Sequence, residues 1–176
     1  MCLDRILLKK AQNGDIEAVE KLLRRYERYV FNTALGFFKN AYDASDAAQE
    51  AMIKIYRKIG AFRGDASFRS WIFRITINVC KDMLRKTKEV LPIDDEDFAN
   101  LQSDSMTPEQ ALDNKLERAR VIDAIQQLDE DFRNVIILRE LNDESYEDIA
   151  RQLDISEGTV KSRIFRARNK LKELLE

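Results

Sequence analysis

The sequence predicts an all-α protein made of two small helical domains, and three observations lead to this fold class. Apolar residues recur at intervals of three and four along most of the 176-residue chain, as in amphipathic helices. No segment alternates apolar and polar residues convincingly enough to indicate a strand. Both prolines lie in one acidic central stretch rich in Asp, Ser and Asn, a composition typical of a linker. We therefore expect a flexible acidic linker (89–112) between an N-terminal domain (1–88) and a C-terminal domain (113–176).

Eight segments carry the helical spacing, four in each domain. The third segment has two distinct faces, one apolar and one acidic around a single isoleucine. An acidic face is commonly just solvated, but a charged rim around an apolar residue is also typical of a surface that binds another protein. The expected helices are 3–12, 15–38, 43–59, 67–87, 113–128, 131–141, 145–153 and 156–175, and the acidic face consists of Asp46, Gln49, Glu50 and Ile53.

The connection "FRGDASFRSW", at 62–71, is crowded with aromatic and basic residues for a short loop. One interpretation is a turn packed onto the domain beneath it. The other is a loop built to hold a nucleic-acid base, in which Gly64 allows the bend and small residues leave room for one base. In that case Phe62, Phe68 and Trp71 give the loop an apolar footing, and Phe68 belongs to the footing rather than to the pocket.

The helix that follows this loop presents polar donors along one face. Their spacings of four, three and four residues place them on the same side of the helix. The surrounding segment 63–88 holds seven basic residues against two acidic ones. A donor face beside an aromatic loop suits single-stranded or opened DNA, whose unstacked bases need a platform. The donors are Arg74, Asn78, Lys81 and Arg85.

The last two expected helices form a helix-turn-helix pattern. Ser145, with Asp148 three residues on, resembles a capping box, and Ser156 can cap the second helix. Five apolar residues of the second helix recur at spacings of four and three, which predicts one buried stripe. That stripe consists of Val160, Ile164, Ala167, Leu171 and Leu174.

The opposite face of the second helix is basic and carries one phenylalanine. Lys and Arg side chains can donate to guanine or to phosphate, and an exposed Phe suits the thymine methyl group. The alternative is an ordinary solvated face with the phenylalanine turned into the core. The capped preceding helix and the tight turn favour DNA binding. The face consists of Lys161, Ser162, Phe165, Arg166, Asn169 and Lys172.

Composition excludes several other classes of protein. The formal net charge is only −2, but residues 89–114 hold eight acids and no base, so the charge is segregated. Histidine is absent and Cys2 lies far from Cys80, which argues against a zinc site and against imidazole catalysis. We expect no cofactor, reduced thiols and a cytoplasmic location. Because no run of 18 apolar residues occurs, we expect no membrane insertion.

Two stretches carry a resemblance to a known family. "DASDAAQEAMIKIYRKIGAFRGDASFRSWIFRITINVCKDMLRK" resembles region 2 of the extracytoplasmic-function (ECF, group IV) sigma factors of bacterial RNA polymerase, in the sigma-70 family. "SYEDIARQLDISEGTVKSRIFRARNKL" is similar to their region 4. The resemblance spans nearly the whole chain, and the acidic segment lies where that family has its inter-domain linker.

The resemblance implies a role for each surface. The acidic face of helix 43–59 would dock to the β′ clamp helices of core polymerase, and the β flap would be a further contact. Phe62, Arg63, Gly64, Asp65, Ala66 and Ser67 would form the loop that captures a flipped base of the minus-10 element. Trp71, Arg74, Asn78 and Lys81 would read or hold the non-template strand.

In the C-terminal domain, the resemblance implies recognition of the minus-35 element. Lys161, Ser162, Phe165 and Arg166 would enter the major groove, while Arg168, Asn169 and Lys172 would brace phosphates. The linker would thread toward the RNA exit path. An anti-sigma factor is a further expected partner, although no residue identifies it.

We therefore expect an alternative sigma factor, not an enzyme, that directs core polymerase to specific promoters and assists their opening in a stress or envelope response. One alternative is a stand-alone transcriptional regulator whose N-terminal domain senses a signal or dimerises. Another is an enzyme with a metal bound by the "IDDEDF" acids, but those lack the Gly of a calcium loop and a second ligand cluster.

Overall fold

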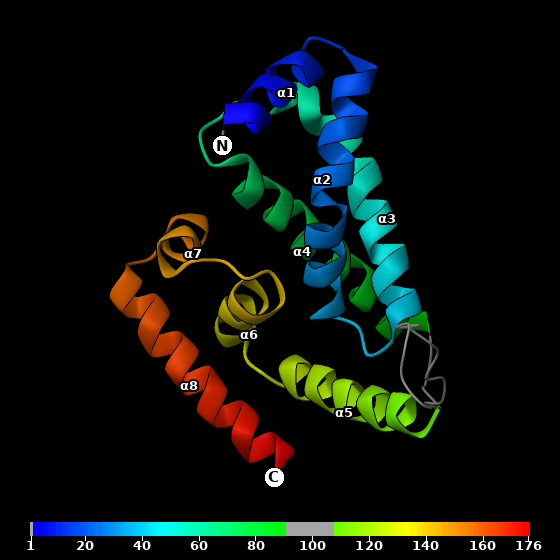
Figure 1. Ribbon diagram of the computed structural model, residues 1–176, viewed down its shortest axis with the longest axis vertical. Coiled ribbons are helices and arrows are strands. Elements are labelled where there is room, and N and C mark those ends of the chain that lie inside the picture. The colour runs from blue at the N-terminus through cyan, green and yellow to red at the C-terminus, as the bar shows by residue number, and fades with distance from the viewer. Residues whose placement is uncertain (1, 91–107) are drawn as a thin grey trace.

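The computed structural model describes residues 2–90 and 108–176, and every regular element in these two ranges is helical (Figure 1). This confirms the all-α prediction, whereas most of the expected linker lies outside the described residues. The N-terminal domain contains α1 (Cys2–Gln12), α2 (Ile16–Leu35), α3 (Ala41–Lys58), the 3-10 turn η1 (Ile59–Ala61) and α4 (Phe68–Val90). The C-terminal domain contains α5 (Pro108–Gln126), α6 (Glu130–Ile136), the π-helical turn η2 (Ile137–Leu141), α7 (Tyr146–Leu153) and α8 (Glu157–Leu175).

Side-chain caps set where several helices begin. The carboxylate of Asp15 accepts a hydrogen bond from the backbone N–H of Ala18 (3.0 Å) at the start of α2. At the start of α7, the hydroxyl of Ser145 accepts from the backbone N–H of Asp148 (3.1 Å) and donates to its carboxylate (2.6 Å). Ser156 caps α8 in the same way, accepting from the N–H of Thr159 (3.1 Å). The caps predicted for the last two helices are therefore confirmed.

The segment expected as one α-helix at 131–141 has a wider last turn. After α6 the backbone becomes π-helical, and the N–H of Asn142 donates to the carbonyl of Ile137, five residues earlier (3.0 Å). Both Ile137 and Leu138 remain fully buried through this change. The apolar spacing of the segment is compatible with either winding, so the sequence pattern did not distinguish them.

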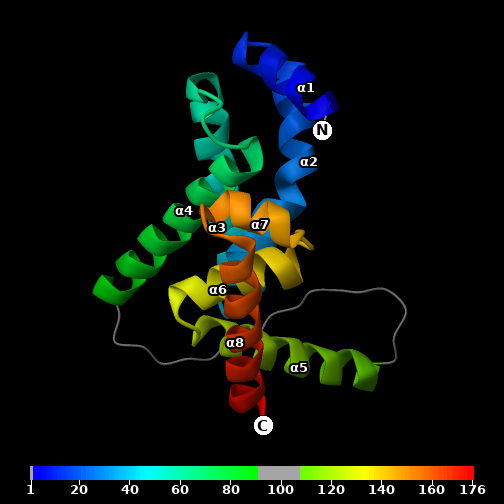
Figure 2. The same ribbon diagram turned by 90° about the vertical axis from the view of Figure 1, so that its left-hand side faces the viewer.

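The two domains pack against each other and share one hydrophobic core. Val30, Phe37 and Phe73 of the N-terminal domain lie in the same buried cluster as Ile137 and Ile149 of the C-terminal domain. Between the domains, α7 contacts α4 and η2 contacts α2, and in Figure 2 α8 lies in front of the other helices, on the side facing the viewer. Two smaller clusters complete the interior, one between α1 and α2 and one among α5, α6 and α8.

At Gly36 the backbone of the N-terminal domain lies very close to a side chain of the C-terminal domain. A Cβ atom added to Gly36, which follows α2, would overlap the Cγ1 and Cδ1 atoms of Ile137 in η2. Gly36 has a helical φ of −70°, so what requires glycine here is space, not backbone conformation.

Candidate nucleic-acid and polymerase interface

An aromatic cluster supports the loop between η1 and α4. The ring of Phe62 lies 5.4 Å from that of Phe68 and 5.3 Å from that of Trp71, and the Phe68 and Trp71 rings stack at 5.5 Å. Tyr26 of α2 packs edge-on against Phe68 (5.4 Å). Phe62 is only 9% exposed, so the structure places its ring in the footing beneath the loop.

The tip of the loop is exposed above this footing. Arg63, Gly64, Asp65 and Ser67 are all accessible, and Ala66 is half-buried. Gly64 has a φ of +82°, in the left-handed region that favours glycine, so the expected bend is present. The loop thus places small exposed residues above a packed cluster of aromatic rings.

Hydrogen bonds fix the loop at both ends. The side-chain amide of Gln12, at the end of α1, donates to the carbonyl of Phe62 (2.7 Å). At the other end, the hydroxyl of Ser67 accepts from the backbone N–H of Ser70 (3.0 Å) and caps α4. Sequence reasoning missed Gln12, because a polar residue fifty positions from its partner leaves no periodic signal.

The donor face of α4 is partly free and partly engaged. Arg74 and Asn78 are exposed, and no hydrogen bond or ion pair to them is found within the described part of the chain. The ammonium of Lys81 lies 2.6 Å from the carboxylate of Glu130 in α6, across the domain boundary. Arg85 pairs with Asp82 of its own helix (3.2 Å), and Trp71 is half-buried in the aromatic cluster.

The acidic face of α3 is exposed as expected. Asp46, Gln49 and Glu50 are accessible around Ile53, whose side chain is 45% exposed. Tyr56, one turn further on, is 52% exposed and enlarges the apolar centre. Sequence reasoning missed Tyr56, although its spacing of three from Ile53 was a usable signal.

Helices α7 and α8 form the expected helix-turn-helix. The turn between them depends on Asp154, which ends α7 with a φ of 56° in the left-handed region that Asp tolerates better than most residues. The N–H of Ile155 then returns to the carbonyl of Ala150 (3.1 Å). Val160, Ile164 and Ala167 of the predicted stripe are buried, and Leu171 is half-buried. Leu174, also predicted to be buried, is 38% exposed in the last turn of α8.

The basic side chains of α8 divide into two groups. On the outer face, Phe165 is 67% exposed, which rules out its alternative position in the core. Lys161 and Arg166 flank it, and the structure shows no ion pair for either among the described residues. The other exposed members of this face are Ser162, whose hydroxyl donates to the carbonyl of Thr159 (2.9 Å), Asn169, and Lys172, which lies 3.5 Å from Glu176.

The second group of bases is held by acids of the same domain. The guanidinium of Arg168 contacts one carboxylate oxygen of Glu140 through Nε (3.1 Å) and Nη2 (2.6 Å), and this pairing raises the pKa of Arg168. Arg163 pairs with Asp131 through a single nitrogen, Nη2 (2.6 Å). Arg168, expected to brace phosphate, therefore has its charge committed to Glu140.

A shallow groove runs beside this ion-paired flank. Its volume is about 500 Å³, and Ile136, Leu171 and Leu175 line it together with charged residues. An apolar floor bordered by charge suits the binding of an amphipathic helix.

The described residues give little support for a metal site, a reactive thiol or a membrane-spanning helix. Within residues 2–90 and 108–176, no group of three His, Cys, Asp or Glu side chains is placed to hold a metal, and the "IDDEDF" acids lie outside these ranges. Burial raises the pKa of the Cys80 thiol to about 12, so it stays protonated and unreactive. No helix in the described part is long and apolar enough to cross a membrane.

Comparison with known proteins identifies two family regions in the chain. The model described as "Sigma-70 region 2" matches residues 22–90, which cover α2, α3, the loop and α4. The model described as "Sigma-70, region 4" matches residues 118–171, which cover most of the C-terminal domain.

Curated relatives match over almost the full length. The RNA polymerase sigma-H factor of Pseudomonas aeruginosa is 38% identical over 181 residues, covering 98% of this chain and 94% of that protein. The ECF RNA polymerase sigma-E factor of Haemophilus influenzae is 39% identical, with 98% and 95% covered. The sigma-E factor of Escherichia coli is 36% identical, with 98% and 96% covered.

Solved structures share the fold. CnrH, in complex with the cytosolic domain of CnrY, superposes with a TM-score of 0.72 at 29% identity, covering 98% of this chain and 97% of that one. The sigma factor RpoE of Bartonella quintana, in complex with the anti-sigma factor NepR, gives a TM-score of 0.67 at 25% identity, with 91% and 98% covered.

Proposed function

The chain belongs to the sigma-70 family of RNA polymerase subunits, as an ECF member, and on this basis we propose how its surfaces divide the work of transcription initiation. It is an alternative sigma factor that binds core polymerase, directs it to specific promoters and assists their opening. Its role is to position polymerase and DNA, so it carries out no covalent chemistry itself. We place it in the cytoplasm, where polymerase and promoter DNA are found.

The outer face of α8 reads the minus-35 element. Its exposed Phe165 can contact a thymine methyl group, and the uncommitted Lys161 and Arg166 can donate to guanine or to phosphate. Arg168 acts indirectly, because its pairing with Glu140 fixes α8 against the end of η2. Because the basic side chains on the other flank of α8 are paired with acids, we assign recognition of the minus-35 element to the outer face.

The loop above the aromatic cluster captures one base of the minus-10 element. Unstacking a base costs a few kcal/mol, so the receiving loop has to be rigid before the base arrives. The aromatic footing and the bonds from Gln12 and Ser67 provide that rigidity. The exposed Arg74 and Asn78 then lie about two and three turns into α4, where the displaced strand can follow them.

Core polymerase docks on the acidic face of α3. The exposed Ile53 and Tyr56 give this face an apolar centre, and Asp46, Gln49 and Glu50 give it a polar rim. By similarity, the β′ clamp helices are the partner, and the β flap is a second contact. Because the related sigma factor RpoE was solved in complex with the anti-sigma factor NepR, we propose an anti-sigma factor as a further partner.

The observation that carries this proposal is that one chain joins a duplex-reading helix, a base-holding loop and a docking face, all of them exposed. Run-off transcription with sigma-free core polymerase tests it. We expect initiation from specific promoters selected out of a random library. DNA binding without initiation would instead support a stand-alone transcriptional regulator.

A further inference from the structure

Four basic side chains near the base-holding loop have no acid to neutralise them. All four are exposed, and no ion pair to them is found within the part of the chain that the structure describes. Segment 51–64, which contains two of them, holds no Asp or Glu. We call these four side chains the basic rim, and they are Arg5 and Lys9 of α1 and Arg57 and Lys58 in the last turn of α3.

Other bases of the same part of the domain are paired. The ammonium of Lys54, one turn before the end of α3, lies 3.6 Å from the carboxylate of Glu50. The guanidinium of Arg25 lies 3.2 Å from the carboxylate of Asp4, which adjoins Arg5 in α1. Acids are therefore present here and pair with other bases. The basic rim is a local excess of positive charge.

The rim lies beside the loop because α1 and α3 end at the same place. Turn η1 directly follows α3 and contacts α1, and Ile59 of η1 belongs to the same buried cluster as Ala11. The side chain of Gln12, at the end of α1, donates to the carbonyl of Phe62 in the loop (2.7 Å). Figures 1 and 2 show the ends of α1 and α3 together at one end of the molecule, far from α5.

Within α1, the rim shares one side of the helix with Gln12. Lys9 lies three residues before Gln12 and Arg5 lies seven before it, a spacing that places all three on one side. At about 1.5 Å per residue, this stripe extends about 10 Å from the loop. That is the length of roughly three stacked nucleotides at about 3.4 Å each. The stripe can therefore contact consecutive phosphates of a strand that continues from the loop.

The ends of the two helices offset only part of this charge. Lys9, Arg57 and Lys58 stand in last turns, where the helix dipole favours a base. Each helix end contributes about half a negative charge, and Asp65 is the one acid of the loop. Together with Arg63 of the loop, the rim outweighs them. The surplus of positive charge attracts a polyanion.

We propose that the basic rim binds phosphates of the displaced DNA strand, on the side of the captured base away from α4. Helix α4 leads away from α1 (Figure 1), so Arg74 and Asn78 hold the strand on one side of the loop and the rim holds it on the other. Contacts to phosphate carry no base sequence. The inference rests on the proposed function and extends the path of the strand to α1, which lies outside the residues that the region 2 model matches.

Phosphate contacts on both sides of the captured base help to offset its unstacking, which costs a few kcal/mol. They also release counterions. For a single strand, each neutralised phosphate adds about 0.7 to the slope of log affinity against log salt concentration. Each rim base that meets a phosphate should therefore contribute about 0.7 to this salt slope.

Reconstituted holoenzyme and the single-stranded non-template oligonucleotide of a promoter that it selects test the site. Lys9→Gln and Arg57→Gln each remove one charge from an exposed side chain. Each should weaken oligonucleotide binding about threefold to tenfold and lower the salt slope by about 0.7. Lys9→Arg keeps the charge and should restore both values.

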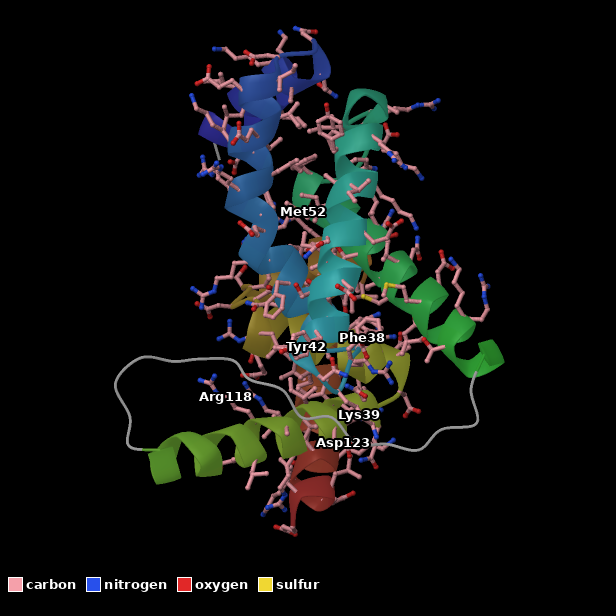
Figure 3. The ribbon with its side chains drawn as sticks, turned by 90° about the vertical axis from the view of Figure 1, so that its right-hand side faces the viewer. Phe38, Lys39, Tyr42, Met52, Arg118 and Asp123 are labelled. Atoms are coloured by element: carbon pink, nitrogen blue, oxygen red, sulfur yellow. The ribbon has the colours of Figure 1, made fainter. Side chains whose placement is uncertain are left out.

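Arg118→Gln is the matched control for the loss of one charge. Arg118 is exposed and, like the rim, has no ion pair among the described residues. Figure 3 places it on α5, at the opposite end of the molecule from α1. Its substitution should leave oligonucleotide affinity and salt slope at the wild-type values.

Oligonucleotides with uncharged methylphosphonate linkages locate the contact. On one flank of the minus-10 element, neutral linkages should weaken binding by wild type and leave binding by Lys9→Gln almost unchanged, because the contact is already lost. On the other flank, which follows α4, they should weaken both proteins to the same extent.

Unchanged affinity and salt slope in Lys9→Gln and Arg57→Gln would overturn the proposal. Equal sensitivity of Lys9→Gln and wild type to neutral linkages on both flanks would do the same. Weaker binding of the variants to core polymerase without DNA would make the rim a polymerase contact, which also overturns it. Run-off transcription by wild type tests the function separately. If wild type initiates while the rim variants bind the strand normally, only the rim site is refuted.

Discussion

Arg166 and Arg168 lie two residues apart on α8, and we expect their loss to have opposite consequences. Arg166 is exposed beside Phe165 and has no ion pair among the described residues, whereas Arg168 is bound through two nitrogens to Glu140. Arg166→Ala should therefore lose DNA selectivity and keep stability. Arg168→Ala should lose stability and largely keep selectivity.

The structure sets the size of each effect. A side chain that reads a base is worth about 1–3 kcal/mol, so Arg166→Ala should reduce discrimination at one minus-35 position by roughly 5- to 150-fold. The Arg168–Glu140 pair is half exposed, with side chains 54% and 41% accessible, so its loss should cost only about 0.2–1 kcal/mol. In a domain of this size that corresponds to a fall in Tm of roughly 1–8 °C.

Two measurements separate the variants. Thermal unfolding followed by circular dichroism reports the stability of the free chain. Competition among minus-35 duplexes for reconstituted holoenzyme reports selectivity at each base. The assignment of the two faces of α8 would be refuted if Arg168→Ala relaxed selectivity as much as Arg166→Ala, or if Arg166→Ala lowered Tm by the larger amount.

Three further predictions concern the N-terminal domain and the domain contact. Gln12→Ala removes the hydrogen bond to the Phe62 carbonyl and should slow promoter opening several-fold while polymerase affinity stays unchanged. Permanganate footprinting measures the opening. An equal loss of promoter opening and of polymerase affinity would contradict this prediction. Ile53→Asp should weaken core-polymerase binding by about tenfold or more in a pull-down titration, while wild-type affinity would remove α3 as the docking face. Burial raises the pKa of Glu144 above its ordinary 4.5, although Arg69 opposes the shift, so ionised Glu144 costs stability. That cost is absent below about pH 4.5 and appears as pH rises through the raised pKa, so Glu144→Gln should gain in Tm relative to wild type with rising pH.

Local signals were sufficient to predict the helices and much of the candidate site. Ser145 and Ser156 mark helix starts through side chains that act within three residues, and apolar spacing assigned buried and outer faces. The exposure of Phe165 follows from the same periodicity. These features depend on neighbours along one helix, which the sequence displays directly.

Features that depend on contacts between distant segments were not predictable in this way. Gln12 reaches Phe62 across fifty residues, and Lys81 meets Glu130 across forty-nine, with nothing in either residue type to specify the partner. The position of Phe62 was also not predictable from the sequence, because an aromatic ring suits both contact with a base and packing beneath the loop. The packing of Phe68 and Trp71 around Phe62 places its ring in the interior.

The π-helical turn has a consequence for insertions and deletions in this chain. It accommodates one residue more than an α-helix of the same length, and each residue of an α-helix advances the chain by about 100°. Deleting one residue between 137 and 141 would restore regular winding and rotate the chain that follows. The carbonyl of Leu141 and the amide of Asn142 would then lose Asn32 and Thr33, which they contact at 2.6 and 2.9 Å. A deletion of one residue in the π-helical turn would therefore remove two hydrogen bonds between the two domains.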